Sequence, residues 1–212
     1  MKTKHINSLF QALLKNNPKP QTELKYANHF TFLIAVILSA QATDISVNKA
    51  TKNLFKIIKT PTDMVSLGEN RLKKYIKTIG LFNIKARNIV KLSKILIRDY
   101  NSEVPKNFDK LINLPGVGNK TASVFQNEIL NLPRIAVDTH VFRVTNRIGI
   151  VKGANANLVQ LKLEKIVPIK WLLKAHHLLI FHGRRVCKAQ KPLCEKCTIS
   201  HFCNYKKNLL NN

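Results

Sequence analysis

The sequence has few acidic residues, and this shortage is its most informative feature. Its 212 residues include 36 lysines and arginines but only 11 aspartates and glutamates, which gives a formal net charge of +25. Hydrophobic residues make up 45% of the chain, which is enough for a folded core and excludes a disordered basic tail. An AT-rich coding sequence would explain some of the lysine but not the scarcity of acids. A folded chain this basic is typical of proteins that bind a polyanion, either nucleic acid or an anionic membrane surface.

Long apolar segments and targeting signals are also missing. The run FTFLIAVILSA (30–40) has 11 residues, about half of what a membrane-spanning helix needs, so we interpret it as a buried core helix. The apolar stretch near the N-terminus is broken by Gln11 and is too short for a signal-peptide core. The first arginine is Arg71, which argues against a mitochondrial transit peptide. We therefore expect a cytoplasmic protein with no membrane segment.

Cysteine is absent outside one short segment, CKAQKPLCEKCTISHFC (187–203). In a reducing compartment, such clustering favours metal binding over disulfides. The spacing of the four cysteines differs from that of ferredoxins and from that of the zinc ribbon with two CxxC pairs. From the residues alone, a structural Zn²⁺ bound by four thiolates is a reasonable interpretation. The four candidate ligands are Cys187, Cys194, Cys197 and Cys203.

Helical periodicity dominates the chain and predicts an all-α fold. Only Ile135–Val137 resembles a strand, and it is too short to build a sheet. Pro61–Asp63 is expected to precede a short turn, and the last five residues are expected to fray. Besides the run at 30–40, apolar residues recur at helical spacing in segments 3–16, 43–59, 69–80, 83–100, 108–114, 119–130, 138–149, 155–167 and 171–186.

The segment FDKLINL-PGVG-NKTASVFQ (108–126) predicts two helices joined by a tight turn. Pro115 ends the first helix, while Gly116 and Gly118, on either side of Val117, permit backbone angles that other residues avoid. The turn would present consecutive N–H groups at a helix N-terminus, an arrangement that suits a phosphate. Taken alone, this short motif is more often an ordinary interhelical turn.

Lys120 follows this turn, in the first turn of the predicted helix. The helix dipole opposes an ammonium there and favours the neutral amine that Schiff-base chemistry requires. Asp138 lies 18 residues later, at a position that predicts a helix N-cap with an ionised carboxylate. The ordinary alternatives are a solvated surface lysine and an aspartate that only caps its helix. If the two helices converge, these residues could form a nucleophile–carboxylate pair.

The segments LSAQATD (38–44), LPGVGNKTA (114–122) and AVDTHVFRV (136–144), together with the cysteine spacing, resemble the endonuclease III family of helix-hairpin-helix DNA glycosylases. The resemblance covers nearly the whole chain. It implies a two-lobed all-α fold with DNA lying across the cleft between the lobes. One lobe would be a six-helix barrel at 22–132, and the other would combine 1–21 with 133–212. Asn119 departs from the family, because many members carry a basic residue at that position.

The resemblance also implies an activity and a set of roles. It implies a glycosylase with AP lyase activity that removes oxidised pyrimidines from duplex DNA and cleaves 3′ to the abasic site by β-elimination. Lys120 would form the Schiff base and Asp138 would be the catalytic aspartate. Because the damaged nucleotide must leave the base stack, Gln41 and Leu81 would fill the gap. The family's loop spacing implies that the four cysteines hold a [4Fe-4S] cluster.

The partner implied is damaged double-stranded DNA. Contacts to it would come from residues 115–118 of the turn and from Lys191, which lies among the cysteines in a basic loop suited to phosphates. We expect a monomer that associates with the nucleoid. Two other functions stay open. An adenine-mismatch glycosylase shares the turn, the aspartate and the cluster but characteristically lacks the lysine, and a non-catalytic DNA-binding module would use its metal only for folding.

Overall fold

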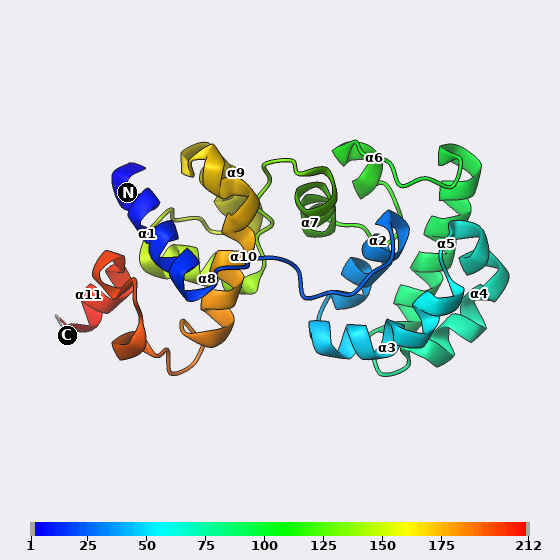
Figure 1. The fold of residues 1–212 in the computed structure, drawn as a ribbon, viewed down its shortest axis with the longest axis horizontal. Coiled ribbons are helices and arrows are strands. Elements are labelled where there is room, and N and C mark those ends of the chain that lie inside the picture. Colours follow the sequence, from blue (N-terminus) through cyan, green and yellow to red (C-terminus); the bar gives the residue numbers. More distant parts are fainter. Residues whose placement is uncertain (1–2, 211–212) are drawn as a thin grey trace. The chain divides into compact units, whose positions relative to one another are not determined.

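The computed structural model describes residues 3–210, and these contain helices but no strand (Figure 1). The predicted all-α fold is confirmed. The α-helices are α1 (Thr3–Asn16), α2 (His29–Ser39), α3 (Asp44–Ile57), α4 (Pro61–Ile76), α5 (Phe82–Tyr100), α6 (Phe108–Ile112), α7 (Asn119–Leu130), α8 (Thr139–Ile148), α9 (Ala156–Ile166), α10 (Ile169–Arg185) and α11 (Asn204–Leu210). Two short 3₁₀ helices, η1 (Cys194–Lys196) and η2 (Ser200–Phe202), lie in the cysteine segment.

The helices fall into two compact units. Residues 23–130 form one unit, which contains α2 to α7. Residues 3–22 belong with residues 131–210, so α1 is grouped with α8 to α11. Each unit has its own apolar core.

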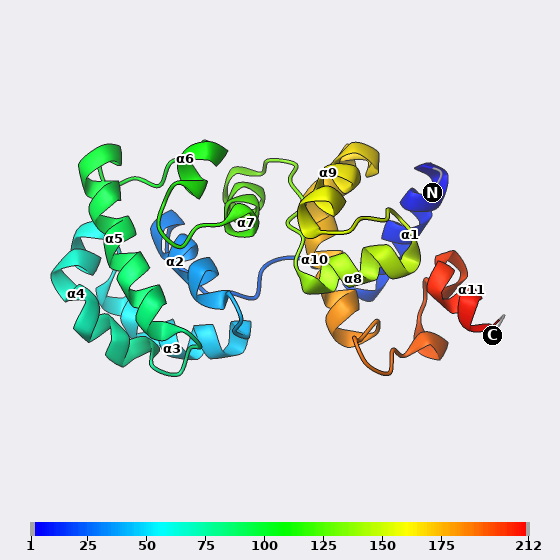
Figure 2. The same ribbon diagram turned by 180° about the vertical axis from the view of Figure 1, so that it is seen from behind.

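Helix α2 is the centre of the first unit (Figure 2). Its residues Phe30–Leu38 are all buried, which confirms the predicted core helix. Asn28 caps its N-terminus: the side chain accepts from the Thr31 N–H, while the Thr31 hydroxyl accepts from the Asn28 N–H. Among residues 3–210, no helix is both long enough and apolar enough to cross a membrane.

In the second unit, α1 packs on α10 although the two helices are far apart in sequence. The rings of Phe10 and Trp171 stack with their centroids 5.6 Å apart. The Trp171 indole N–H also donates to the side-chain oxygen of Asn7 at 2.9 Å. These contacts explain why the first helix belongs to the same core as the C-terminal part of the chain.

Three local predictions were wrong. Pro61–Asp63 is the first turn of α4, capped by Thr60, and the helix is broken at Gly68, whose φ is +75°. The predicted helical segment 69–80 begins directly after this break, so the sequence pattern shows only the second half of α4 clearly. Ile135–Val137 is buried but is not a strand, and the Ile135 N–H donates to the Glu164 carboxylate at 3.0 Å. Residues 208–210 belong to α11 rather than to a frayed end, and 211–212 lie outside the described residues.

Candidate functional site

The turn between α6 and α7 depends on one of its two glycines. Gly116 has a φ of +82°, and a Cβ placed there would lie 3.2 Å from the Cβ of Asn88, so glycine is required. Gly118 has no positive φ, and a Cβ there would meet nothing within 4 Å. The expectation that both glycines need special backbone angles is therefore correct only for Gly116. Gly118 instead leaves open surface at the start of α7.

Val117 fixes this turn to the core. Its side chain is 5% exposed, and its N–H donates to the Leu114 carbonyl at 3.0 Å. Neither its side chain nor its N–H is therefore presented to a ligand. Pro115 is half-buried, so the exposed surface of the turn consists mainly of Gly116 and Gly118.

Lys120 lies in the first turn of α7, as predicted, and is exposed. No acidic residue occurs in this first turn. The amine is thus carried at the positive end of a helix, directly after the surface left open by Gly118.

Gln41 and Leu81 lie in neighbouring loops of the same unit. A Cβ on Gly80 would lie 3.8 Å from the Gln41 carbonyl oxygen. Both residues have left-handed backbone conformations, with φ of +56° at Gln41 and +59° at Leu81. Such angles are strained for residues with side chains and are enriched at functional sites. Leu81 is 56% exposed although it is a large apolar residue.

Lys85 is a site residue that the sequence analysis missed. It is only 6% exposed, and its ammonium donates to the carbonyls of Leu38 at 2.9 Å and Ala40 at 2.5 Å. Burial lowers the pKa of its side chain. A signal was available in the sequence, because Lys85 is in helical phase with the apolar residues Ile89 and Leu96 of α5.

Asp138 caps helix α8, as predicted. One carboxylate oxygen accepts from the N–H groups of His140 at 2.9 Å and Val141 at 2.8 Å. The side chain is half-buried, and its two hydrogen bonds to the helix N-terminus hold it in one orientation.

His140, in the first turn of α8, is packed against α10. A Cβ on Gly183 would lie 2.9 Å from the His140 Cβ, so this close approach requires glycine. Burial is the main cause that lowers the pKa of His140, with Asp138 acting in the opposite direction. Arg143 lies 3.1 Å from the His140 ring and donates to the Gly183 carbonyl at 3.0 Å. These contacts hold α8 to α10.

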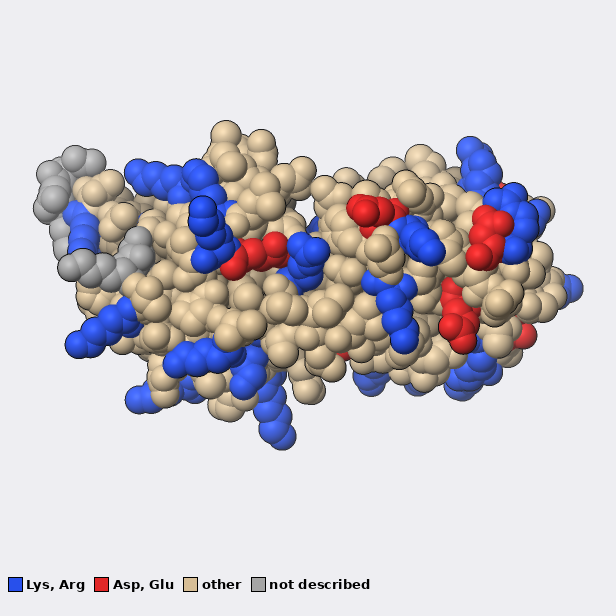
Figure 3. Space-filling model, turned by 90° about the horizontal axis from the view of Figure 1, so that it is seen from above, with Lys and Arg blue, Asp and Glu red and all other residues tan. Residues whose placement is uncertain are grey.

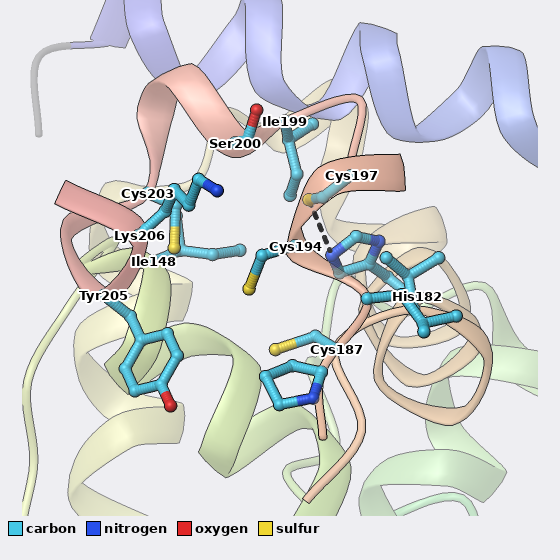
Figure 4. A pocket seen from close by; sticks show the side chains of 13 residues that line it. Ile148, His182, Cys187, Cys194, Cys197, Ile199, Ser200, Cys203, Tyr205 and Lys206 are labelled. Atoms are coloured by element: carbon cyan, nitrogen blue, oxygen red, sulfur yellow. Dashed lines mark hydrogen bonds between the residues drawn. The ribbon is translucent and has the colours of Figure 1, made fainter. Parts of the chain in front are cut away.

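The four cysteines line one cavity, and Figure 4 shows their side chains around it. Apolar side chains, including Ile148, Leu193 and Ile199, line the same cavity. Burial raises the pKa of the thiols of Cys197 and Cys203. Among residues 3–210, no three histidine, cysteine or acidic side chains are gathered closely enough to hold a single metal ion.

The loop that carries the cysteines is basic and rigidly held. Arg143 donates to the Cys187 carbonyl at 3.1 Å, and Arg147 donates to the carbonyls of Lys188 at 2.6 Å and Ala189 at 2.9 Å. Lys191 is exposed and has a φ of +46°. Its side chain therefore extends from a loop whose backbone is fixed by α8.

The predicted site residues thus fall into separate groups. Gln41, Leu81 and the α6–α7 turn with Lys120 belong to the unit 23–130. Asp138 and the four cysteines belong to the other unit. The structure gathers the cysteines around one cavity and places Gln41 beside the loop of Leu81.

Comparison with known proteins identifies the family. Residues 34–169 match the HhH-GPD superfamily of base excision DNA repair proteins. The chain belongs to this family. It is 56% identical to endonuclease III of Rickettsia conorii over 99% of this chain and 100% of that protein. It is 51% identical to endonuclease III of Escherichia coli over 92% of each chain.

A solved structure agrees with these sequence relatives. The chain matches the structure of a trapped endonuclease III–DNA covalent intermediate with a TM-score of 0.92 and 43% identity, over 99% of both chains. With this similarity along its whole length, the chain is a base excision repair DNA glycosylase with AP lyase activity, of the endonuclease III type. A non-catalytic DNA-binding module is excluded.

Proposed function

We propose that the protein removes oxidised pyrimidines from duplex DNA and then cleaves the strand 3′ to the abasic site, with Lys120 as the nucleophile. The observation that carries this proposal is the position of Lys120. An exposed amine at the positive end of α7 directly follows a turn with open surface at Gly118. A DNA backbone bound at that turn would bring a deoxyribose within reach of the amine.

The chemistry follows from a primary amine at this position. The neutral amine of Lys120 attacks C1′, the glycosidic bond breaks, and the base leaves with the bonding electrons and takes up a proton. Ring opening gives an iminium that acidifies the protons on C2′. Loss of one of these protons expels the 3′ phosphate by β-elimination. A hydrolytic glycosylase that lacks a lysine here would stop at the abasic site.

Asp138 is proposed as the carboxylate that stabilises positive charge at C1′. Its two backbone hydrogen bonds hold it in place, so its position is set before charge develops at C1′. It could also assist proton transfer.

The remaining residues are proposed to hold DNA in the reactive form. The exposed parts of residues 115–118 and Lys191 bind phosphates, while Gln41 and Leu81 occupy the space that the extruded nucleotide leaves. Leu81 suits this role because a large apolar side chain is held exposed by a strained backbone. We further propose that α2 to α7 form the six-helix barrel of the family, and that the protein acts as a monomer in the nucleoid.

The four cysteines are proposed to hold a [4Fe-4S] cluster. Four thiols around one cavity match the donor set that such a cluster needs, and the resemblance to endonuclease III favours it over Zn²⁺. The cluster would stabilise the loop that presents Lys191. Purified native protein should be yellow-brown. It should contain about four irons and about four inorganic sulfides per chain, the content of one [4Fe-4S] cluster. Stoichiometric zinc without sulfide would disprove this assignment.

Borohydride trapping tests the role of Lys120. Reduction of the iminium should link wild-type protein covalently to DNA that contains an oxidised pyrimidine. Lys120→Gln should abolish trapping and strand cleavage but retain lesion binding. Lys110→Gln is the matched control, because it removes an exposed lysine charge from the other helix of the same hairpin. Trapping by Lys120→Gln at the wild-type level would place the nucleophile elsewhere.

Asp138→Asn tests the carboxylate separately from the cap. Asparagine is also a good N-cap residue, so α8 should keep its hydrogen bonds and stability. Base removal should slow by about two orders of magnitude, in line with the loss of one preorganised electrostatic interaction. An unchanged rate would show that Asp138 only caps the helix.

A further inference from the structure

Lys85 connects the two loops that carry Gln41 and Leu81. Its side chain donates to the carbonyls of Leu38 and Ala40, and Ala40 directly precedes Gln41. Its backbone N–H donates to the Leu81 carbonyl at 3.0 Å, which is the first helical hydrogen bond of α5. One residue therefore holds the backbone next to both strained positions.

The local electrostatics explain why a lysine can be buried here. Leu38 and Ala40 lie at the C-terminal end of α2, where the last carbonyls have no helical N–H partner and carry partial negative charge. The ammonium satisfies two of these carbonyls. The side chain is only 6% exposed, and this burial lowers its pKa. Such charge-assisted hydrogen bonds are stronger than those between neutral groups.

The strained loops need a restraint of this kind. A left-handed conformation costs about 1–2 kcal/mol for a residue with a Cβ, so both loops would relax without tertiary contacts. A Cβ on Gly80 would lie 3.8 Å from the Gln41 carbonyl oxygen, an ordinary van der Waals distance, so the two loops are neighbours. The Ala42 N–H donates to the Ser39 carbonyl at 3.1 Å, and its side chain packs against the core. Lys85 adds hydrogen bonds that join this turn to α5.

We propose that Lys85 is a positioning residue that fixes Gln41 and Leu81 in the geometry needed to fill the gap in the DNA. It acts through those two residues and does not contact the reacting atoms. This inference rests on the proposed roles of Gln41 and Leu81. It predicts that Lys85 affects the rate at which a damaged base is extruded and removed, rather than general affinity for DNA.

Single-turnover kinetics on full-length protein with its cofactor test this inference. Lys85→Met keeps an unbranched side chain but removes the hydrogen bonds. The excision rate per active site, with active sites counted by borohydride trapping on a preformed abasic site, should fall about tenfold, as expected for loss of a charge-assisted hydrogen bond. Affinity for undamaged duplex should not change. Lys94→Met, on the exposed face of α5, is the control and should keep the wild-type rate.

A double-mutant cycle with Gln41→Ala separates positioning from a purely structural role. If Lys85 acts through Gln41, Lys85→Met should slow excision much less in the Gln41→Ala background than in the wild type. Lys85→Arg, which can still donate to both carbonyls, should recover part of the rate. Additive effects, or a loss explained wholly by fewer active molecules, would overturn the inference. If Gln41→Ala alone has no effect on excision, the proposed gap-filling role fails instead.

Discussion

The guanidinium of Arg147 lies 3.7 Å from the Cys187 sulfur and also binds the backbone of the two residues near it. Arg147 packs over the ring of Tyr205 as well, at 4.7 Å from its centroid. Helix α8, which Asp138 caps, therefore holds both sides of the cysteine cavity. The residues that line the cavity are held by a planar side chain that donates several hydrogen bonds at once.

If the cysteines hold the proposed cluster, Arg147→Ala should weaken its retention. The change removes the contacts to Lys188 and Ala189, so the loop that carries Cys187 loses two hydrogen bonds to α8 and keeps the one from Arg143 to the Cys187 carbonyl. Iron content after purification should be lower than in the wild type, and iron should be lost faster to a chelator. Arg147→Lys should be intermediate, because lysine restores the charge but not the planar guanidinium that donates to two carbonyls. Iron retention equal to that of the wild type in Arg147→Ala would show that the Arg147 contacts are not needed to hold the loop.

Alanine substitutions at the two glycines of the hairpin should change different properties of the protein, one its stability and the other its affinity for DNA. Gly116→Ala should lower the free energy of unfolding by about 1–2 kcal/mol because of its left-handed backbone, and more because of the contact with Asn88. Gly118→Ala should leave stability unchanged, since its Cβ meets nothing, but should weaken binding to duplex DNA. Urea denaturation and duplex titration measure the two effects. A stability loss in Gly118→Ala with normal binding would contradict this division.

Binding to undamaged duplex should weaken steeply with salt. Lysine and arginine side chains clearly exceed acidic ones on the face drawn in Figure 3, in keeping with the net charge of +25. Each neutralised phosphate contributes about 0.9 to the slope of log affinity against log salt, so several contacts give a slope of several. Lys191→Ala should reduce the slope by about one if Lys191 binds a phosphate. A slope near zero would mean that the charge does not serve DNA binding.

Acid should destabilise the protein partly through His177. Burial, with His176 and Arg184 adding smaller effects, lowers the pKa of His177 to about 3. The unfolded chain therefore binds more protons between about pH 6.5 and 3, and stability falls as the pH falls through this window. The linkage amounts to about 2 kcal/mol between pH 7 and pH 5. His177→Gln should show a smaller loss of stability over that range, whereas the exposed His5→Gln should behave like the wild type.

The structure shows which features a sequence can predict. The helices, the cap at Asp138 and the position of Lys120 follow from local patterns, because capping and periodicity involve residues close in sequence. The hydrogen bonds of Lys85 do not follow from them, because they join residues 45 and 47 positions apart. The different steric requirements at Gly116 and Gly118 could not be predicted from the sequence either, since they depend on whether Asn88 packs behind the turn.

The pairing of Trp171 with Asn7 and Phe10 has a consequence for biosynthesis. A ribosome releases residues 23–130 before it has made α10, so this unit can fold while the nascent chain is still short. Helix α1 emerges before this unit but has only 14 residues, a length at which an isolated helix is marginal. It therefore reaches its native place only after α10 has been made, and the cysteine loop, which follows α10 in the sequence, is completed later still.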